Sequence, residues 1–297
     1  MKNNTDLHGV IVPVHTPFND DLSVDFEGLR NDVHRLCDYG VHGLMILGSN
    51  GEFGNLTIEE RKKIAEVVIA EVGDRIPIIV HVGHSTMSYA QDLAEHAQET
   101  GAPAVMCLPP YLLNPNQEDI YQYFTEIAKR LDIDMVLYNN PGPTNIMIDP
   151  STIARLAKTE KINYLKDSGR NLRHTSDIIQ SVGESMVVLS GEADLFLPIL
   201  ALGGKGGIVV PSLVAPSKTI EMYEAMVSGD THGARTAHYQ LMELIHVLVS
   251  EGKYRAAVKA ALNLQGRAGG RTRPPLSDIS ESCKNRLREV LEKIGVI

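Results

Sequence analysis

The chain has 297 residues, of which 43% are hydrophobic and 22% are charged, the proportions of an ordinary soluble globular protein. Its 28 basic and 37 acidic residues give a net charge of −9, which argues against a nucleic-acid partner and against an anionic membrane surface. No apolar run approaches the roughly 18 residues that a membrane helix needs, so we expect no membrane association.

The cysteines and the N-terminus indicate a cytoplasmic protein. Cys37, Cys107 and Cys283 are too widely spaced for a disulfide framework or a zinc site, and we expect them to be reduced thiols. The first residues lack the basic region and apolar core of a signal peptide, so we expect no secretion.

Short apolar runs alternate with amphipathic helical patterns along the first 228 residues. The expected strands span 10–14, 44–47, 77–82, 104–108, 135–139, 162–166, 186–190 and 207–210. The expected helices span 25–39, 57–72, 85–100, 116–130, 172–182, 195–202 and 217–227, with a further one opening at Asp149-Pro150. Thr57 and Glu60 have the spacing of a capping box, which places the start of the second helix.

Eight strand–helix units in this length are typical of a closed (β/α)8 or TIM barrel, an α/β fold. A doubly wound open sheet is the alternative, because periodicity does not count strands around a ring. The remaining residues show no strand pattern and three expected helices, at 231–250, 253–264 and 280–294. We therefore predict a barrel domain at 1–228 and a C-terminal three-helix extension at 229–297.

Lys166 ends the apolar strand 162–166, where a charged side chain is costly to bury. Desolvation lowers the pKa of an ammonium group, and the free amine can then attack a carbonyl carbon to form an imine. The simpler alternative is an ion pair with Asp167 or another carboxylate. Because functional groups in such barrels lie at the carboxyl ends of the strands, the neighbouring strand ends decide between the two.

Two other strand ends carry matching chemistry. The second strand runs into Gly48-Ser-Asn-Gly-Glu52, whose backbone N–H groups could face a small carboxylate, although a plain turn has the same composition. Tyr138 ends the fifth strand, one βα unit before Lys166, and could pass protons; a merely structural tyrosine is the alternative. Together the turn, the phenol and the lysine predict imine chemistry on a 2-oxo acid.

On these motifs the chain resembles the dihydrodipicolinate synthase / N-acetylneuraminate lyase family of Schiff-base lyases along nearly its whole length. The other motifs that carry the resemblance are Thr16-Pro-Phe18, Pro110-Tyr111, Tyr138-Asn139, Lys166-Asp167, Gly206-Gly207-Ile208 and Arg273-Pro-Pro275. The resemblance implies a homotetramer without a cofactor or metal, with Lys166 forming the imine and Tyr138 shuttling protons. It also implies substrate binding by the Gly48, Ser49 and Asn50 turn and by the backbone carbonyl of Ile208.

Several positions depart from the branches of this family. The synthase branch has an arginine where this chain has Pro143, and a relay tyrosine where it has Leu112. The sialic acid lyase branch has a serine at Val210, whereas Glu192 stands where that branch binds polyol hydroxyls. We therefore expect an aldolase or dehydratase for a 2-keto-3-deoxy or hydroxy-oxo acid. The alternative is a dihydrodipicolinate synthase that condenses pyruvate with aspartate semialdehyde.

Three further hypotheses concern other sites or another class of protein. His15, His81 and His84 could meet at the barrel mouth in a zinc-dependent aldolase, but no acidic ligand accompanies them in sequence. The segment 266–271 is expected to be an exposed connector, with a phosphate site as the alternative. A non-catalytic keto-acid-binding barrel would look similar, yet binding alone does not require both Tyr138 and Lys166.

Overall fold

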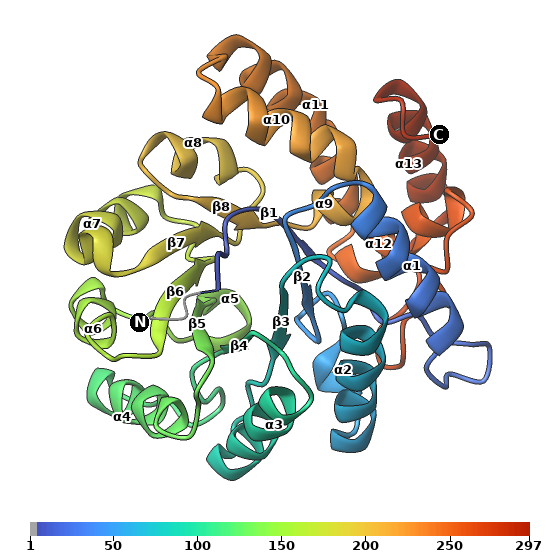
Figure 1. Ribbon diagram of the computed structural model, residues 1–297. Helices are drawn as coiled ribbons and strands as arrows, with labels where there is room; N and C mark the ends of the chain where they lie inside the picture. Colours follow the sequence, from blue (N-terminus) through green and yellow to red (C-terminus); the bar gives the residue numbers. More distant parts are fainter. Residues whose placement is uncertain (1–4) are drawn as a thin grey trace.

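The computed structural model describes residues 5–297, in which eight parallel strands close into one barrel (Figure 1). Each strand pairs with the next in the chain, and the eighth pairs with the first. The strands are β1 (Gly9–Pro13), β2 (Gly43–Ile46), β3 (Ile78–His81), β4 (Ala104–Cys107), β5 (Asp134–Asn139), β6 (Ile162–Asp167), β7 (Val187–Ser190) and β8 (Gly206–Ile208). The predicted TIM barrel is confirmed, and the open sheet is wrong.

Helices surround the barrel between successive strands. The main ones are α1 (Phe26–Asp38), α2 (Ile58–Val72), α3 (Met87–Glu99), α4 (Gln117–Ala128), α6 (Pro150–Leu156), α7 (Leu172–Val182), α8 (Phe196–Ala201) and α10 (Pro216–Val227). The capping box at α2 is present: the Thr57 hydroxyl accepts from the Glu60 N–H at 3.1 Å, and the Glu60 carboxylate accepts from the Thr57 N–H at 2.9 Å.

Four short helical segments were not predicted. They are the helices α5 (Pro141–Thr144) and α9 (Pro211–Val214) and the 3-10 turns η1 (Phe53–Asn55) and η2 (Gly183–Ser185). Both short helices begin at a proline, which is favoured at the first helical position because it has no N–H to leave unpaired. They follow β5 and β8 directly and so lie at the carboxyl end of the barrel.

The strands are buried on both faces, as expected for a parallel barrel covered by helices. Inward-facing side chains such as Ile11, Met45, Met106 and Leu189 fill the barrel interior. A larger cluster joins the outer faces of the strands to the helices. This double packing makes the barrel a rigid frame for the side chains at its carboxyl end.

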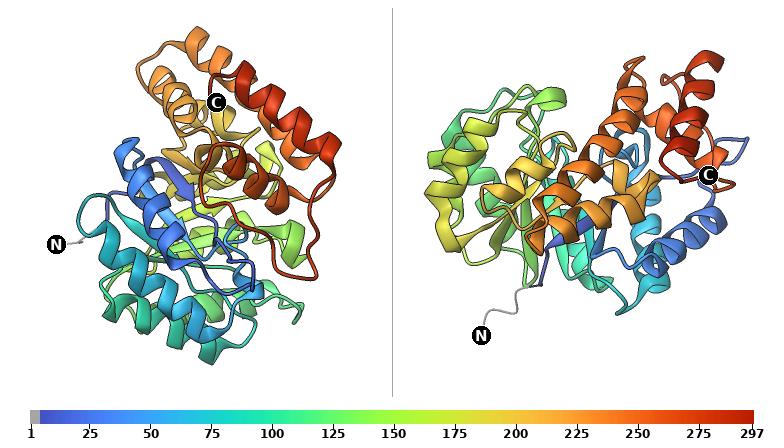
Figure 2. Two further views of the ribbon diagram at one scale, coloured as in Figure 1. Left: turned by 90° about the vertical axis from the view of Figure 1, so that its right-hand side faces the viewer. Right: turned by 90° about the horizontal axis from the view of Figure 1, so that it is seen from above.

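The C-terminal residues form α11 (Thr231–Val249), α12 (Tyr254–Leu264) and α13 (Glu281–Lys293), at one side of the barrel (Figure 2). Buried ion pairs attach them: Lys259 Nζ lies 2.7 Å from Glu52 Oε1, and Arg267 Nε lies 2.7 Å from Asp32 Oδ1. Within residues 5–297, no helix combines the length and apolar character that a membrane crossing requires.

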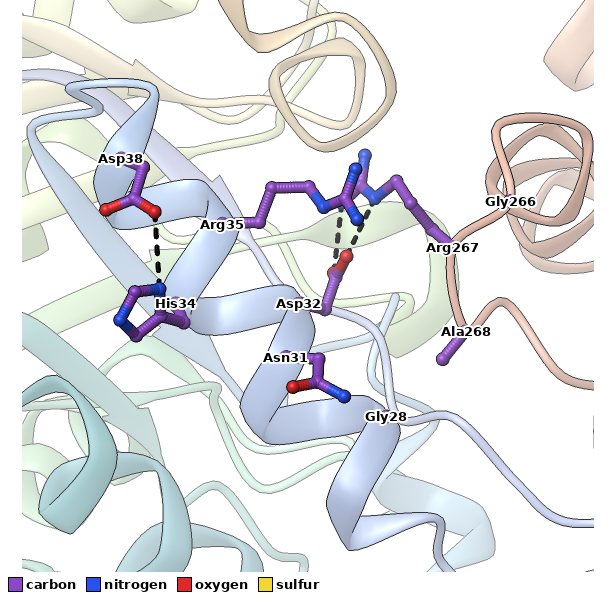
Figure 3. A pocket seen from close by; sticks show the side chains of 9 residues that line it. All are labelled: Gly28, Asn31, Asp32, His34, Arg35, Asp38, Gly266, Arg267 and Ala268. Atoms are coloured by element: carbon purple, nitrogen blue, oxygen red, sulfur yellow. Dashed lines mark hydrogen bonds and ion pairs between the residues drawn. The ribbon is translucent and has the colours of Figure 1, made fainter.

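The segment 266–271 is anchored at Arg267, which is buried rather than exposed. Its guanidinium reaches across to Asp32 on α1 with two hydrogen bonds (Figure 3). It also donates to the Leu213 carbonyl at 2.6 Å. The expected exposed connector is therefore wrong at this residue. The segment fastens the C-terminal helices to α1 and α9.

Candidate active site

Tyr138 and Lys166 lie side by side at the carboxyl ends of β5 and β6, where they are register partners in the parallel pairing. The Nζ atom of Lys166 is 4.2 Å from the centre of the Tyr138 ring. Both side chains are 4% exposed. The prediction that they are neighbours on adjacent strands is confirmed.

Lys166 is electrostatically poised for nucleophilic attack. Burial lowers its pKa to about 7, and the charge of Glu192 opposes part of that fall. Within residues 5–297, no carboxylate lies within 4.0 Å of Nζ. Asp167 is instead bound to the amide of Asn139 at 2.7 Å and to the hydroxyl of Thr175. The ion pair considered from sequence is therefore absent, and about half of the amine is free at neutral pH.

The Tyr138 hydroxyl is held by Asn140, whose Nδ2 donates to it at 2.8 Å. Burial raises the pKa of Tyr138 to about 12, while the hydroxyls of Ser168 and Ser49 and the charge of Arg255 oppose part of that rise. Because its oxygen already accepts a hydrogen bond, the phenol can direct its own proton into the cavity. The Tyr138 phenol can therefore donate its proton, and the resulting phenolate can accept a proton again.

The turn after β2 is shaped to receive an anion. Asn50 donates from Nδ2 to the Pro13 carbonyl at 2.8 Å, which fixes its amide, while its Oδ1 is buried without a partner. Within residues 5–297, the backbone N–H groups of Ser49 and Asn50 have no acceptor. Free N–H groups in a tight turn are a common carboxylate cradle.

Gly48 does not line the cavity. A Cβ atom at this position would lie 2.7 Å from the sulfur of Met45, so glycine allows the turn to pass close to the barrel interior.

Ser49, Asn50, Tyr138, Lys166, Glu192 and Ile208 line one cavity of about 540 Å³ at the carboxyl end of the barrel. The structure thus brings together these six predicted site residues. Within residues 5–297 this cavity contains the buried, unpaired lysine that imine chemistry needs.

Glu192 follows β7 and carries its own counterion. Arg170 Nε lies 2.9 Å from Glu192 Oε2. Burial raises the pKa of Glu192, and the charges of Arg170 and Lys166 oppose that rise. The carboxylate is therefore partly neutralised at the side of the cavity that follows β7.

Sequence reasoning missed several cavity residues. Ser168 lies two residues beyond Lys166, and a Cβ at Gly191 would be 2.0 Å from Ser168 Oγ and 3.0 Å from Lys166 Cε. A strand-end pattern could have found these two. Tyr254 and Arg255 come from the start of α12, and no local pattern indicates that this helix reaches the barrel mouth.

The three histidines do not line this cavity. His15 bonds to the Ala268 carbonyl at 2.8 Å, and His81 packs against Phe53 with its ring centre 4.5 Å away. His84 accepts a backbone N–H through Nδ1. In the part of the chain that the structure describes, no group of three or more His, Cys, Asp or Glu side chains is placed to hold a metal.

A second cavity, of about 570 Å³, lies between α1 and residues 266–268 (Figure 3). Asp32 and Arg267 in its wall bind each other, and His34 pairs with Asp38 at 3.2 Å. It holds none of the predicted site residues. The cavity at the barrel mouth, which gathers six of the predicted residues, is therefore the candidate active site despite the similar volume of this one.

The chain is similar to known proteins along nearly its whole length. Residues 6–294 match the family model described as the Dihydrodipicolinate synthetase family. A curated 4-hydroxy-tetrahydrodipicolinate synthase from Methanopyrus kandleri is 38% identical over 98% of this chain and 97% of its own length. The crystal structure of dihydrodipicolinate synthase from Aquifex aeolicus superposes with a TM-score of 0.93 at 36% identity, covering 97% of this chain and 98% of that one. YagE, a prophage protein of Escherichia coli K12 solved in complex with pyruvate, superposes with a TM-score of 0.94 at 29% identity, covering 99% and 100%.

Proposed function

This chain belongs to the Dihydrodipicolinate synthetase family, and we propose that Lys166 is the residue through which it binds its substrate as an imine. The protein is a class I lyase that acts through a Schiff base. The observation that carries the assignment of Lys166 is a buried amine with a pKa of about 7 next to a buried phenol. The similarity to YagE, which was solved with pyruvate, supports a pyruvate-type 2-oxo acid.

The geometry supports the following sequence for a 4-hydroxy-2-oxo acid. The Lys166 amine attacks C2, and Tyr138 gives a proton to the departing oxygen, which leaves as water. The Tyr138 phenolate then takes the proton of the C4 hydroxyl as the C3–C4 bond breaks, so that C4 leaves as an aldehyde and the bonding electrons pass to the iminium to form an enamine. Tyr138 returns that proton to C3 of the enamine, and water then releases pyruvate, restores the Lys166 amine and gives its surplus proton back to the Tyr138 phenolate.

The Ser49–Asn50 turn would hold the C1 carboxylate during these steps. Its unpaired N–H groups, with the Ser49 hydroxyl, supply donors near Tyr138. Glu192 and the backbone of Ile208 would meet the remainder of the substrate, since both line the same cavity. Gly48 would contribute by allowing the turn, not by contact with substrate.

Cleavage or dehydration of a 2-keto-3-deoxy or hydroxy-oxo acid is our preferred activity. The reason lies at two positions: Pro143 lines the cavity without a charge, and Leu112, 84% exposed, has no proton to relay. A synthase that condenses pyruvate with aspartate semialdehyde is the second candidate, because curated relatives at 36–38% identity carry that name.

Borohydride trapping tests the role of Lys166. Pyruvate and borohydride together should inactivate the protein and add mass to the peptide that contains Lys166. The K166R variant should fold, as judged by circular dichroism, and take up no label. A label on another lysine, or none with any of a panel of 2-oxo acids, would contradict the assignment.

We further propose a cytoplasmic homotetramer of chains that each combine a barrel domain, 1–228, with an extension, 229–297. Buried free thiols at Cys37, Cys107 and Cys283 suit a reducing compartment. Leu112 and Leu113, 84% and 65% exposed, are an apolar pair suited to a subunit contact. Light scattering of the purified protein at several concentrations measures the assembly directly.

A further inference from the structure

Two cavities adjoin at the barrel mouth. Beside the 540 Å³ cavity that holds Lys166 lies a smaller one of about 300 Å³. The residues that line both are Ser49, Pro143 and Arg255. A substrate with its C2 atom at Lys166 and its C1 carboxylate at the Ser49 turn therefore has room to extend past Arg255.

Arg255 is fixed in place but has unused hydrogen-bonding capacity. Its Nε donates to the Ser49 carbonyl at 2.6 Å, and its guanidinium carbon lies 4.8 Å from the centre of the Tyr254 ring. Within residues 5–297, no carboxylate lies within 4.0 Å of its side chain, and its two terminal nitrogens find no acceptor. A guanidinium held at one edge presents the other edge to a carboxylate.

The other cations near the cavity are already engaged or lie elsewhere. Arg170 lines the cavity but binds Glu192 at 2.9 Å. Arg173 is exposed and does not line it. Lys166 is the nucleophile. Arg255 is therefore the arginine of this cavity whose charge is available to a substrate.

We propose that Arg255 binds a carboxylate at the far end of the substrate, which makes the substrate class the 4-hydroxy-2-oxo dicarboxylates. This inference rests on the proposed function. Arg255 lines the same cavity as Pro143, so it supplies a positive charge to the cavity that holds the position where the synthase branch has its arginine. Cleavage between C3 and C4 would release pyruvate and an aldehyde that keeps the distal carboxylate.

The opposite expectation is a neutral, hydroxylated tail. Glu192 and Asp194, which follow β7, line the cavity on the other side of β6 from Pro143. Carboxylates there would accept hydrogen bonds from a polyol and repel a second anion. Arg170 already pairs with Glu192, which reduces the repulsion between that carboxylate and a second substrate carboxylate. In the part of the chain that the structure describes, the positive charge of Arg255 is not offset by a protein carboxylate in this way, so it can attract the substrate carboxylate.

The test compares two five-carbon substrates that differ only in the tail: a 4-hydroxy-2-oxo dicarboxylate and the corresponding 4,5-dihydroxy-2-oxo acid. We expect R255Q to lower kcat/KM for the dicarboxylate about 10–100-fold more than for the neutral substrate, because the two substrates share any effect on the Ser49 turn and on Tyr138. R255K should recover part of the difference, since it keeps the charge but not the fork of donors. The matched control K253Q removes a cation that donates to the Asp278 carbonyl at 2.8 Å outside the cavity, and it should leave the ratio unchanged.

An equal loss on both substrates would overturn the proposal, because Arg255 would then only position the Ser49 turn. Equal activity of R255Q and wild type on the dicarboxylate would overturn it as well. Borohydride trapping with pyruvate separates the two levels of inference. A labelled Lys166 with no charge preference refutes Arg255 alone, whereas an unlabelled wild-type Lys166 refutes the proposed function too.

Discussion

The pH dependence of imine formation is the most direct consequence of the buried Lys166. With a pKa of about 7, about half of its amine is free at pH 7 and about a tenth at pH 6. An ordinary lysine with a pKa of 10.5 has only about one amine in three thousand free at pH 7. Burial therefore raises the reactive fraction at neutral pH by about three orders of magnitude.

The rate of imine formation should follow this fraction. The free amine is the reactive form, so the rate with pyruvate should rise about tenfold per pH unit up to about pH 7 and then level off. Rapid-quench mixing with borohydride, followed by mass spectrometry of the Lys166 peptide, measures that rate between about pH 5.5 and 9.5. A rate that continues to climb to the upper end of this range would refute the lowered pKa.

Glu192 gives the same experiment an internal check. Its charge raises the pKa of Lys166, so E192Q should move the point at which the rate levels off to a lower pH. D177N changes an exposed carboxylate on α7 outside the cavity and should leave that point in place. Equal shifts in both variants would mean that the overall charge of the protein, and not Glu192 in particular, sets the pKa of Lys166.

Four further results are expected. Y138F should reduce turnover by about 10²–10⁴-fold while pyruvate still labels Lys166, and unchanged turnover would leave Tyr138 a packing residue. K166M should be more stable than wild type at pH 6 by a few kcal/mol, because Lys166 binds its proton less tightly in the folded protein than in the unfolded chain. The stability of the wild type should therefore rise from about pH 7 to 10, and urea unfolding of both proteins at pH 6 and 9 shows whether the difference between them shrinks. G191A should lower kcat by about 100-fold, because its Cβ would lie 2.0 Å from Ser168 Oγ and displace the Lys166 side chain. An unchanged kcat in this variant would show that the loop after β7 can move to accept the methyl group. Measured side by side, kcat/KM should be higher for cleavage of a hydroxy-oxo acid than for condensation of pyruvate with aspartate semialdehyde. A kcat/KM for condensation of about 10⁴ M⁻¹s⁻¹ or above would instead favour the synthase activity.

The barrel could be predicted because each unit has a local signal. Apolar runs of strand length alternate with helical periodicity, and the Thr57–Glu60 capping box marks the start of a helix. The strand ends then placed Tyr138 next to Lys166, since adjacent parallel strands end at the same edge. The short helices α5 and α9 escaped prediction because four residues are too few to show a helical period.

The cavity residues that α12 contributes could not be predicted from the sequence. Tyr254 and Arg255 reach the barrel mouth only through the packing of α12, which is decided by contacts with residues some two hundred positions earlier. Lys259, in the same helix, looks like a surface lysine in sequence but pairs with Glu52 in the interior. Local patterns carry no information about such distant partners.

The buried pair of Glu52 and Lys259 has a consequence for how this protein could be divided or redesigned. Glu52 lies in the turn that follows Ser49 and Asn50, and Lys259 lies one helical turn beyond Arg255. The K259M variant would leave Glu52 buried without its counterion, and breaking a buried pair in this way costs about 3–5 kcal/mol. Grafting a foreign C-terminal segment onto the barrel would face the same demand, so an exchange intended to alter substrate range must carry a lysine at this position.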